Sequence, residues 1–122
     1  MKKQNEGDEP EEEEAEWIRP GITVKIKPHE IDPAFHNKKC RINKIIEPYV
    51  AQISIGTAII DIDQTYLETV IPKIGNKVMI LFGKKAGELG VLREANLTEG
   101  YGIVECKTEK VKIAFNFISR YD

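Results

Sequence analysis

The sequence predicts an all-β fold of short strands, as found in small barrels and sandwiches. Two observations lead to this prediction. From Trp17 onward, apolar and polar residues alternate in short runs that are separated by residues typical of turns. No stretch after Trp17 keeps an apolar stripe at helical spacing for about ten residues. Many short strands with closely spaced turns are typical of barrels and sandwiches.

Four such runs fill the first half of the chain. They are ITVKIK at 22–27, RINKII at 41–46, VAQISI at 50–55 and AIIDID at 58–63. The turn-like pieces EPY and GT separate the last three runs. We expect single helical turns only within DQTYLE and AFNFIS.

The second half of the chain repeats the pattern of the first. GITVKI corresponds to GNKVMI, CRINKI to GVLREA, VAQISI to YGIVEC, and AIIDIDQTYLETV to VKIAFNFISRY. In the last pair, Ile62 and Val70 match Ile113 and Tyr121 at a constant separation of 51 positions. A shared order of strands and loops predicts a structural duplication, with Pro72 and Lys73 as a short linker.

Four glycines mark the stretch GNKVMILFGKKAGELGVL at 75–92. Gly83 follows the strand-like run KVMILF, and Gly87 and Gly90 precede the next run. Because glycine tolerates sharp turns, the spacing predicts a tight corner of a barrel. The stretch has neither GxGxxG nor a Gly-Lys pair followed by Ser or Thr, so it does not match the usual phosphate-binding loops.

The charge of the chain is unevenly distributed. Residues 1–16 carry eight acids against two lysines, whereas the whole chain has a net charge of −2, which leaves +4 on the remainder. The first segment has almost no apolar side chains and its like charges repel each other, so we expect a disordered acidic tail at 1–16.

Several site classes find no support in the composition. The chain has two cysteines and two histidines, without the short paired spacing that zinc needs, so we expect free thiols, no metal site and no cofactor. No nucleophile elbow or nucleotide motif occurs, and we expect no enzymatic activity. No apolar run approaches the length of a membrane span or of a secretory signal, so we expect an intracellular protein without membrane association.

The stretch IGNKVMILFGKKAGELGVL resembles a KOW motif, the strand–loop–strand unit of ribosomal and transcription-elongation proteins. The longer segment from Trp17 to Asp122 resembles the C-terminal tandem KOW, SH3-like region of the Kin (kin seventeen) family of nuclear DNA- and RNA-binding proteins. The resemblance is carried by WIRPGITVKI, FHNKKCRINKII, DQTYLETVIP and FNFISRYD. The splicing proteins with a G-patch and KOW domains are similar over LETVIPKIGNKVMILFGKKAG.

This resemblance implies two five-stranded SH3-like barrels packed on each other, at 17–71 and at 72–122, the second containing the KOW motif. It also implies a nuclear protein that binds nucleic acid, RNA rather than duplex DNA, in pre-mRNA splicing or in DNA replication and repair. In the Kin-type region an anion binds between the barrels at two basic positions. These positions correspond to Lys39 and to Arg120, and arginine at the second can contact phosphate through two nitrogens.

The residues alone favour basic loops as the binding surface. Lys38, Lys39 and Arg41 follow the long loop of the first copy, and Lys84 and Lys85 occupy the corresponding loop of the second. Such side chains neutralise phosphates and release counterions, although lysines in loops also serve solubility alone. Phe35, His36 and Tyr101 are candidates for base stacking, and Phe35 is equally suited to cover a barrel end.

Two functions remain open on these grounds. One is a monomeric nucleic-acid-binding module that acts with splicing or repair proteins. The other is a protein interaction module, because SH3-like barrels hold peptides on a sheet edge or in an aromatic groove. The charge of +4 on the body of the chain is compatible with both.

Overall fold

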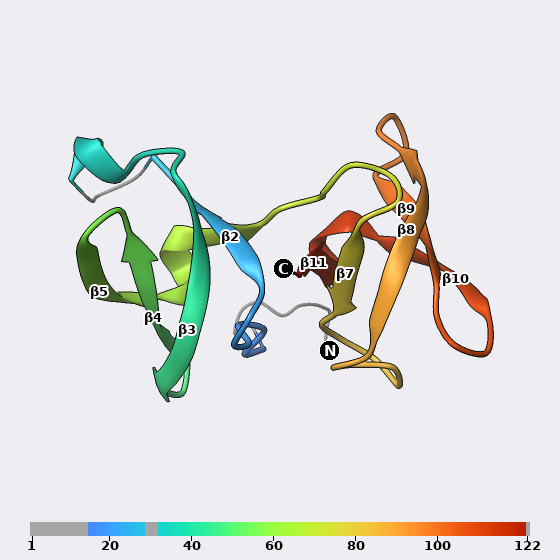
Figure 1. The fold of residues 1–122 in the computed structure, drawn as a ribbon, viewed down its shortest axis with the longest axis horizontal. Helices are drawn as coiled ribbons and strands as arrows, with labels where there is room; N and C mark the ends of the chain where they lie inside the picture. The colour runs from blue at the N-terminus through green and yellow to red at the C-terminus, as the bar shows by residue number, and fades with distance from the viewer. Residues whose placement is uncertain (1–14, 29–31, 122) are drawn as a thin grey trace, which may run out of the picture.

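Two small β-barrels lie side by side in the computed structural model, which describes residues 15–28 and 32–121 (Figure 1). Each barrel is a five-stranded antiparallel sheet, and neither contains an α-helix among the described residues. The all-β prediction and the tandem SH3-like architecture are confirmed. The acidic tail predicted at 1–16 lies almost entirely outside the described residues.

The first sheet has the strand order β5-β4-β3-β2-β6. Its strands are β2 (Thr23–Ile26), β3 (Lys39–Glu47), β4 (Val50–Ile55), β5 (Ala58–Asp63) and β6 (Leu67–Thr69). The strands β3 and β4 pair with register shifts after Ile42 and Ile45, which bend the sheet as a barrel requires.

The second sheet repeats this order as β10-β9-β8-β7-β11. Its strands are β7 (Lys77–Ile80), β8 (Leu89–Asn96), β9 (Tyr101–Glu105), β10 (Lys110–Ala114) and β11 (Ile118–Arg120). The identical connectivity of the two sheets agrees with the duplication seen in the sequence.

Short 3₁₀ turns precede the last strand of each barrel. They are η2 (Gln64–Tyr66) and η3 (Phe115–Phe117), and they fall within the two segments for which the sequence predicted a helical turn. A third turn, η1 (Pro33–Phe35), was not predicted. The side chain of Asp32 caps it by accepting a hydrogen bond from the backbone N–H of Ala34, with Pro33 at the first position.

Alternation along the strands builds two apolar cores. In β2, Val24 and Ile26 are fully buried, whereas Lys25 between them is half-buried on the outer face. The second core is smaller and consists of Val78, Ile80, Leu92, Val104, Cys106 and Ile118. The first core consists of Trp17, Ile18, Ile22, Val24, Ile26, Cys40, Ile42, Ala51, Ile53, Ile62, Leu67 and Leu81.

The first core extends into the second barrel. Leu81, which follows β7, belongs to it with 1% of its surface exposed, and Met79 and Phe82 pack against it. The same cluster includes Trp17 and Ile18, which precede β2 of the first barrel. The barrels therefore share an apolar interface.

Strand β11 closes the second barrel and also lies against the first. It pairs with β7, and it contacts β2 and β6 of the first barrel. Ile22 and Tyr121 form an isolated antiparallel bridge at this seam. Gly21 permits the approach, because a Cβ atom there would lie 2.5 Å from Cε1 of Tyr121.

Gly90 serves the second barrel in a similar way. The sequence placed it at a corner, and the corner glycines Gly83 and Gly87 do have φ values of 89° and 90°. Gly90 has no positive φ and lies inside β8, where a Cβ atom would come within 2.5 Å of Cγ1 of Val104 and 2.9 Å of the Glu105 carbonyl oxygen. Gly90 therefore allows close packing of two strands.

Among the described residues, no helix has the length and apolar character needed to cross a membrane. Both cysteines, Cys40 and Cys106, are buried and unpaired.

Candidate functional site

The outer face of β2 and β3 gathers basic side chains close to the seam between the barrels. Lys39 lies opposite Lys25, and Arg41 lies opposite Thr23, in the antiparallel register of these two strands. Because alternate residues share a face, Lys39 and Arg41 point to the same side of β3 as Lys25 does on β2. Two of the predicted site residues thus occur together, with Lys25 as a third cation.

Arg41 lies nearest to the second barrel. Together with Gly21 and Tyr121 it lines a shallow hollow of about 270 Å³ at the seam. The side chains of Lys39 and Arg41 are exposed, and neither forms an ion pair with a residue that the structure describes. Lys38 is also exposed, and its backbone N–H donates to the carbonyl of Phe35, which fixes the end of the long loop.

Arg120 lies on β11, on the other side of β2 from Lys39. It is in register with Val78, a residue of the second core, and its backbone N–H donates to the carbonyl of Val70 over 2.7 Å. Alternation places its side chain on the opposite face of β11 from Ser119, which contacts the first barrel. Binding of one anion by Lys39 and Arg120 together remains a prediction.

Lys84 and Lys85 lie in the loop between β7 and β8, and Figure 1 shows this loop and the loop that carries η1 on opposite sides of the molecule. The structure does not bring these lysines next to Lys38 and Lys39. Lys84 is exposed, whereas the Lys85 ammonium is 2.8 Å from a carboxylate oxygen of Glu109 and 3.8 Å from one of Glu88. The hydrogen bond to Glu109 raises the pKa of Lys85 and holds its charge in place.

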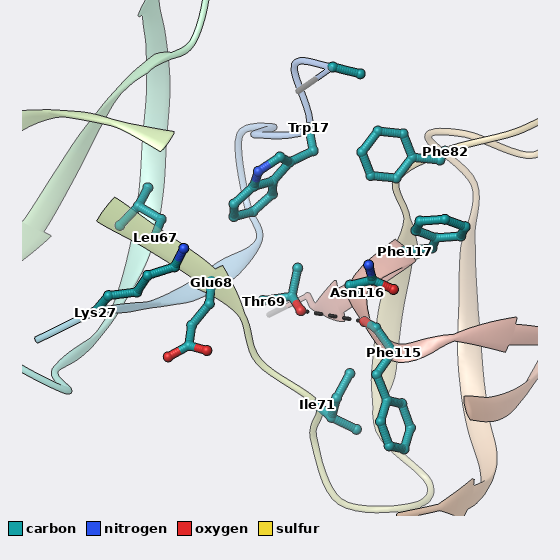
Figure 2. Close-up of a pocket in the computed structure, with 11 residues that line it drawn as sticks. Trp17, Lys27, Leu67, Glu68, Thr69, Ile71, Phe82, Phe115, Asn116 and Phe117 are labelled. Carbon is teal, nitrogen blue, oxygen red and sulfur yellow. Dashed lines mark hydrogen bonds between the residues drawn. The ribbon is translucent and has the colours of Figure 1, made fainter. Parts of the chain in front are cut away.

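A groove of about 550 Å³ runs between the barrels on the side of β6 (Figure 2). Aromatic rings line much of it: Trp17 from the first barrel faces Phe82 and Phe117 of the second. Phe82 and Phe117 contact each other with their centroids 5.1 Å apart and their planes at 58°. Phe117 keeps 41% of its surface exposed, whereas Trp17 is 8% exposed.

Polar groups occupy the rim and the floor of the groove. The hydroxyl of Thr69 donates to the carbonyl of Phe115 over 3.4 Å and links the barrels there. The Asn116 amide projects into the middle of the groove in Figure 2 and makes no hydrogen bond with a described residue. Lys27 and Glu68 stand at one end, where Glu68 pairs with Lys25 at 3.7 Å.

A buried glutamine holds the chain that enters the groove. Gln64 is 2% exposed, and its Nε2 donates to the carbonyl of Ala15 over 3.0 Å. Its Oε1 accepts a hydrogen bond from the backbone N–H of Trp17, also at 3.0 Å. These two bonds fix the indole of Trp17 at the wall of the groove.

Sequence reasoning missed Lys25, Lys27 and the aromatic groove. The alternation of ITVKIK was a usable signal for the two lysines, because it places both on the outer side of this stretch of chain, Lys25 in β2 and Lys27 directly after it. No local signal marked Phe82 and Phe117, which meet only through packing. Of the residues considered for stacking, Phe35 packs against the first core, and Tyr101 lies 4.3 Å beneath the ammonium of Lys112.

Comparison with known proteins finds relatives among the KIN17 proteins. Residues 14–67 match the family model described as the KN17 SH3-like domain. The mouse (Mus musculus) DNA/RNA-binding protein KIN17 is 37% identical over 82 residues, which are 66% of this chain and 21% of that protein. A KIN17-like protein of Dictyostelium discoideum is 30% identical over 88% of this chain and 25% of its own length.

A second group of relatives matches the other resemblance seen in the sequence. The mouse G-patch domain and KOW motifs-containing protein is 29% identical over 86% of this chain and 23% of that protein. The chain thus spans about a quarter or less of the curated relatives that it matches. Among solved structures, AGD34 of Arabidopsis thaliana AGDP1 aligns over 86% of this chain and 83% of that chain, with 11% identity and a TM-score of 0.35.

Proposed function

We propose that this chain, a relative of the KIN17 proteins that carries the KN17 SH3-like domain in residues 14–67, is a nucleic-acid-binding module. Its ligand is the phosphate backbone of RNA, in single strands rather than duplexes. The chain acts without catalysis, as a monomer in the nucleus, in pre-mRNA splicing or in DNA replication and repair. The name of the KIN17 relative supports nucleic-acid binding in general. The preference for RNA, the cellular process and the nuclear location are part of the proposal.

The observation that carries this proposal is the row of cations on the face of β2 and β3. Lys39 lies directly opposite Lys25, and Arg41 follows two residues along the same face of β3. Among the described residues, the acid that pairs with this row is Glu68, which pairs with Lys25. Exposed cations without acidic partners attract a polyanion and release its counterions on binding. Arginine adds a planar fork that fits a phosphate.

The remaining predicted site residues extend this surface in the proposal. Lys38 continues the row beyond Lys39, and Arg120 adds a further cation on β11, on the face opposite to the one that contacts the first barrel. Lys84 and Lys85 lie too far away to join the same row, so they contact a longer RNA that continues around the second barrel. Because Lys85 is held by Glu109, we expect Lys84 to contribute more than Lys85.

Salt dependence of binding tests the proposal. Lys39→Ala and Arg41→Ala should each weaken binding of single-stranded RNA of any sequence. Each should also flatten the slope of log affinity against log salt by about 0.7, the value for one phosphate contact in a single strand. Lys107→Ala is the matched control, since Lys107 is an exposed lysine between β9 and β10 at the far edge of the second sheet.

Three outcomes are informative. Smaller slopes for the two variants and an unchanged slope for the control support the backbone contacts. Equal losses in all three variants indicate a diffuse charge effect and contradict a specific row. Failure of the wild-type chain to bind RNA at about 50 mM salt would reject the function itself.

A further inference from the structure

We propose that the groove between the barrels binds one unstacked base of the RNA, with Phe117 as the stacking platform. This inference rests on the proposed function and adds a second kind of contact to it. The row of cations holds the backbone without regard to sequence, whereas the groove takes the base itself. Three features of the groove carry the argument.

The first feature is an exposed ring on a fixed support. Phe117 keeps 41% of its surface open, and Phe82 packs against it with the ring centroids 5.1 Å apart. The indole of Trp17 forms the opposite wall (Figure 2). A flat aromatic ligand that enters the groove can stack on the open ring of Phe117, and bases stack on such rings without strong sequence preference.

The second feature is a hydrogen-bonding group that has no partner among the described residues. Asn116 belongs to η3, next to Phe117, and its side-chain amide points into the groove (Figure 2). An amide offers donors and an acceptor together, which matches the edge of a base. Thr69, in contrast, already donates to Phe115 across the floor of the groove.

The third feature is the path of the phosphates. Lys25 and Lys27 are two positions apart on the outer side of the same stretch of chain, and Lys27 lines the groove. Lys27 forms no ion pair with a residue that the structure describes. The cations therefore continue from Arg41 and Lys39, through Lys25 and Lys27, to the mouth of the aromatic groove.

A proline-rich peptide is the competing occupant, and the groove suits it less well. Grooves that read such peptides are lined with aromatic residues and hold an extended chain that exposes its carbonyls. Here the side chains of Phe82, Phe115 and Phe117 carry no hydrogen-bond donor and Trp17 is 8% exposed, so the amide of Asn116 is left to serve several successive carbonyls. An unpaired lysine at the mouth favours a phosphate.

Trp17 provides a direct readout, because it is the one tryptophan of the chain and lines the groove. The full chain is titrated with a ten-nucleotide oligouridylate and, separately, with inorganic polyphosphate of similar charge. The oligonucleotide should quench the fluorescence of Trp17, whereas polyphosphate should bind the cations without quenching.

Variants at Phe117 separate stacking from charge. Phe117→Leu should weaken binding of the oligonucleotide by about tenfold, because the stacking ring is lost. It should leave the slope of log affinity against log salt unchanged, because no phosphate contact is lost. Phe117→Tyr keeps the ring and should bind as the wild type does, which also guards against a folding defect in the leucine variant. Tyr49→Leu is the matched control, since Tyr49 is 43% exposed on the first barrel.

The results distinguish failure of this inference from failure of the proposed function. If the oligonucleotide binds without quenching Trp17 and Phe117→Leu binds equally well, the groove is not a base site although the chain binds RNA. If neither ligand binds, both proposals fall. If a proline-rich peptide quenches Trp17 and the oligonucleotide does not, the groove belongs to a peptide and the inference is wrong.

Discussion

Ser119 and Thr23 lie 96 positions apart in the chain and are joined by a hydrogen bond of 2.7 Å from Oγ of Ser119 to the carbonyl of Thr23. The same Oγ accepts the backbone N–H of Val70 at 3.0 Å. The register Val24–Thr69 between β2 and β6, continued by one residue, places Thr23 opposite Val70. A side chain of the second barrel is thus inserted between two backbone groups that a continued ladder would have paired.

Removal of the Ser119 hydroxyl should lower the stability of the folded chain. Ser119→Ala removes a fully buried hydroxyl that donates to the carbonyl of Thr23 and accepts from the N–H of Val70, so the N–H of Val70 loses this bond. An unsatisfied buried group costs about 1–3 kcal/mol, so we expect the free energy of unfolding to fall by about that amount. Urea unfolding measures the change. Ser54→Ala is the control, because Ser54 is exposed on β4, and a loss below about 0.5 kcal/mol in both variants would contradict the bridge.

The two barrels should fold as one unit. Residues 72–122 expressed alone would expose Leu81 and Met79, which pack in the first core in the full chain. Residues 15–71 expressed alone would expose Ile18, which belongs to the same core. Halves of about 50 residues bury too little surface to tolerate this loss. We expect poor amide dispersion or aggregation for each half in two-dimensional NMR spectra. Spectra of the halves that superimpose on that of the full chain would show independent folding.

The acidic segment should weaken RNA binding by competing for the cations. Residues 1–14 carry seven acids against two lysines, a net charge of −5, and the rest of the chain has a net charge of +3. Deletion of residues 1–14 keeps Ala15 and its bond to Gln64. Affinity for single-stranded RNA should then rise most at low salt, where charges are least screened. Equal affinities of the full chain and the shortened chain at about 50 mM salt would contradict this competition.

The thiol of Cys40 should be slow to react. Burial raises the pKa of Cys40 to about 11 from the ordinary value of 9.0, because the charged thiolate is poorly solvated there. The thiolate is the nucleophile, so native Cys40 should react with iodoacetamide at pH 8 about a hundredfold more slowly than the same residue in the unfolded chain. Peptide mass spectrometry follows both cysteines separately. Equal rates in the folded and unfolded chains would contradict the burial.

The same shift gives a dependence of stability on pH. Folding favours the protonated thiol, so its contribution to stability is complete below about pH 9 and is lost as the pH rises towards about 11. Cys40→Ala should therefore lose less stability than the wild type between these pH values. Parallel declines in the two chains would show that other groups cause the loss.

Much of the local structure could be read from the sequence because it depends on short-range chemistry. The alternation in ITVKIK and VAQISI predicted strands, since a sheet with one buried face requires apolar residues at every second position. DQTYLE and AFNFIS predicted turns that became η2 and η3. Of the candidate cations, Lys39 was expected just before the strand that begins at Arg41; because β3 begins at Lys39, the two side chains share a face.

What the tertiary structure alone decided is how the two barrels meet. The sequence could not show that Lys84 lies away from Lys39, that Lys85 pairs with Glu109, or that Phe82 and Phe117 face Trp17 across a groove. These relationships depend on the orientation of one sheet against the other. That orientation is set by contacts between residues far apart in the chain, such as the hydroxyl of Ser119 at Thr23 and the side chain of Leu81 in the first core. No local sequence pattern predicts such contacts, because the residues that flank each partner in the sequence do not depend on the contact.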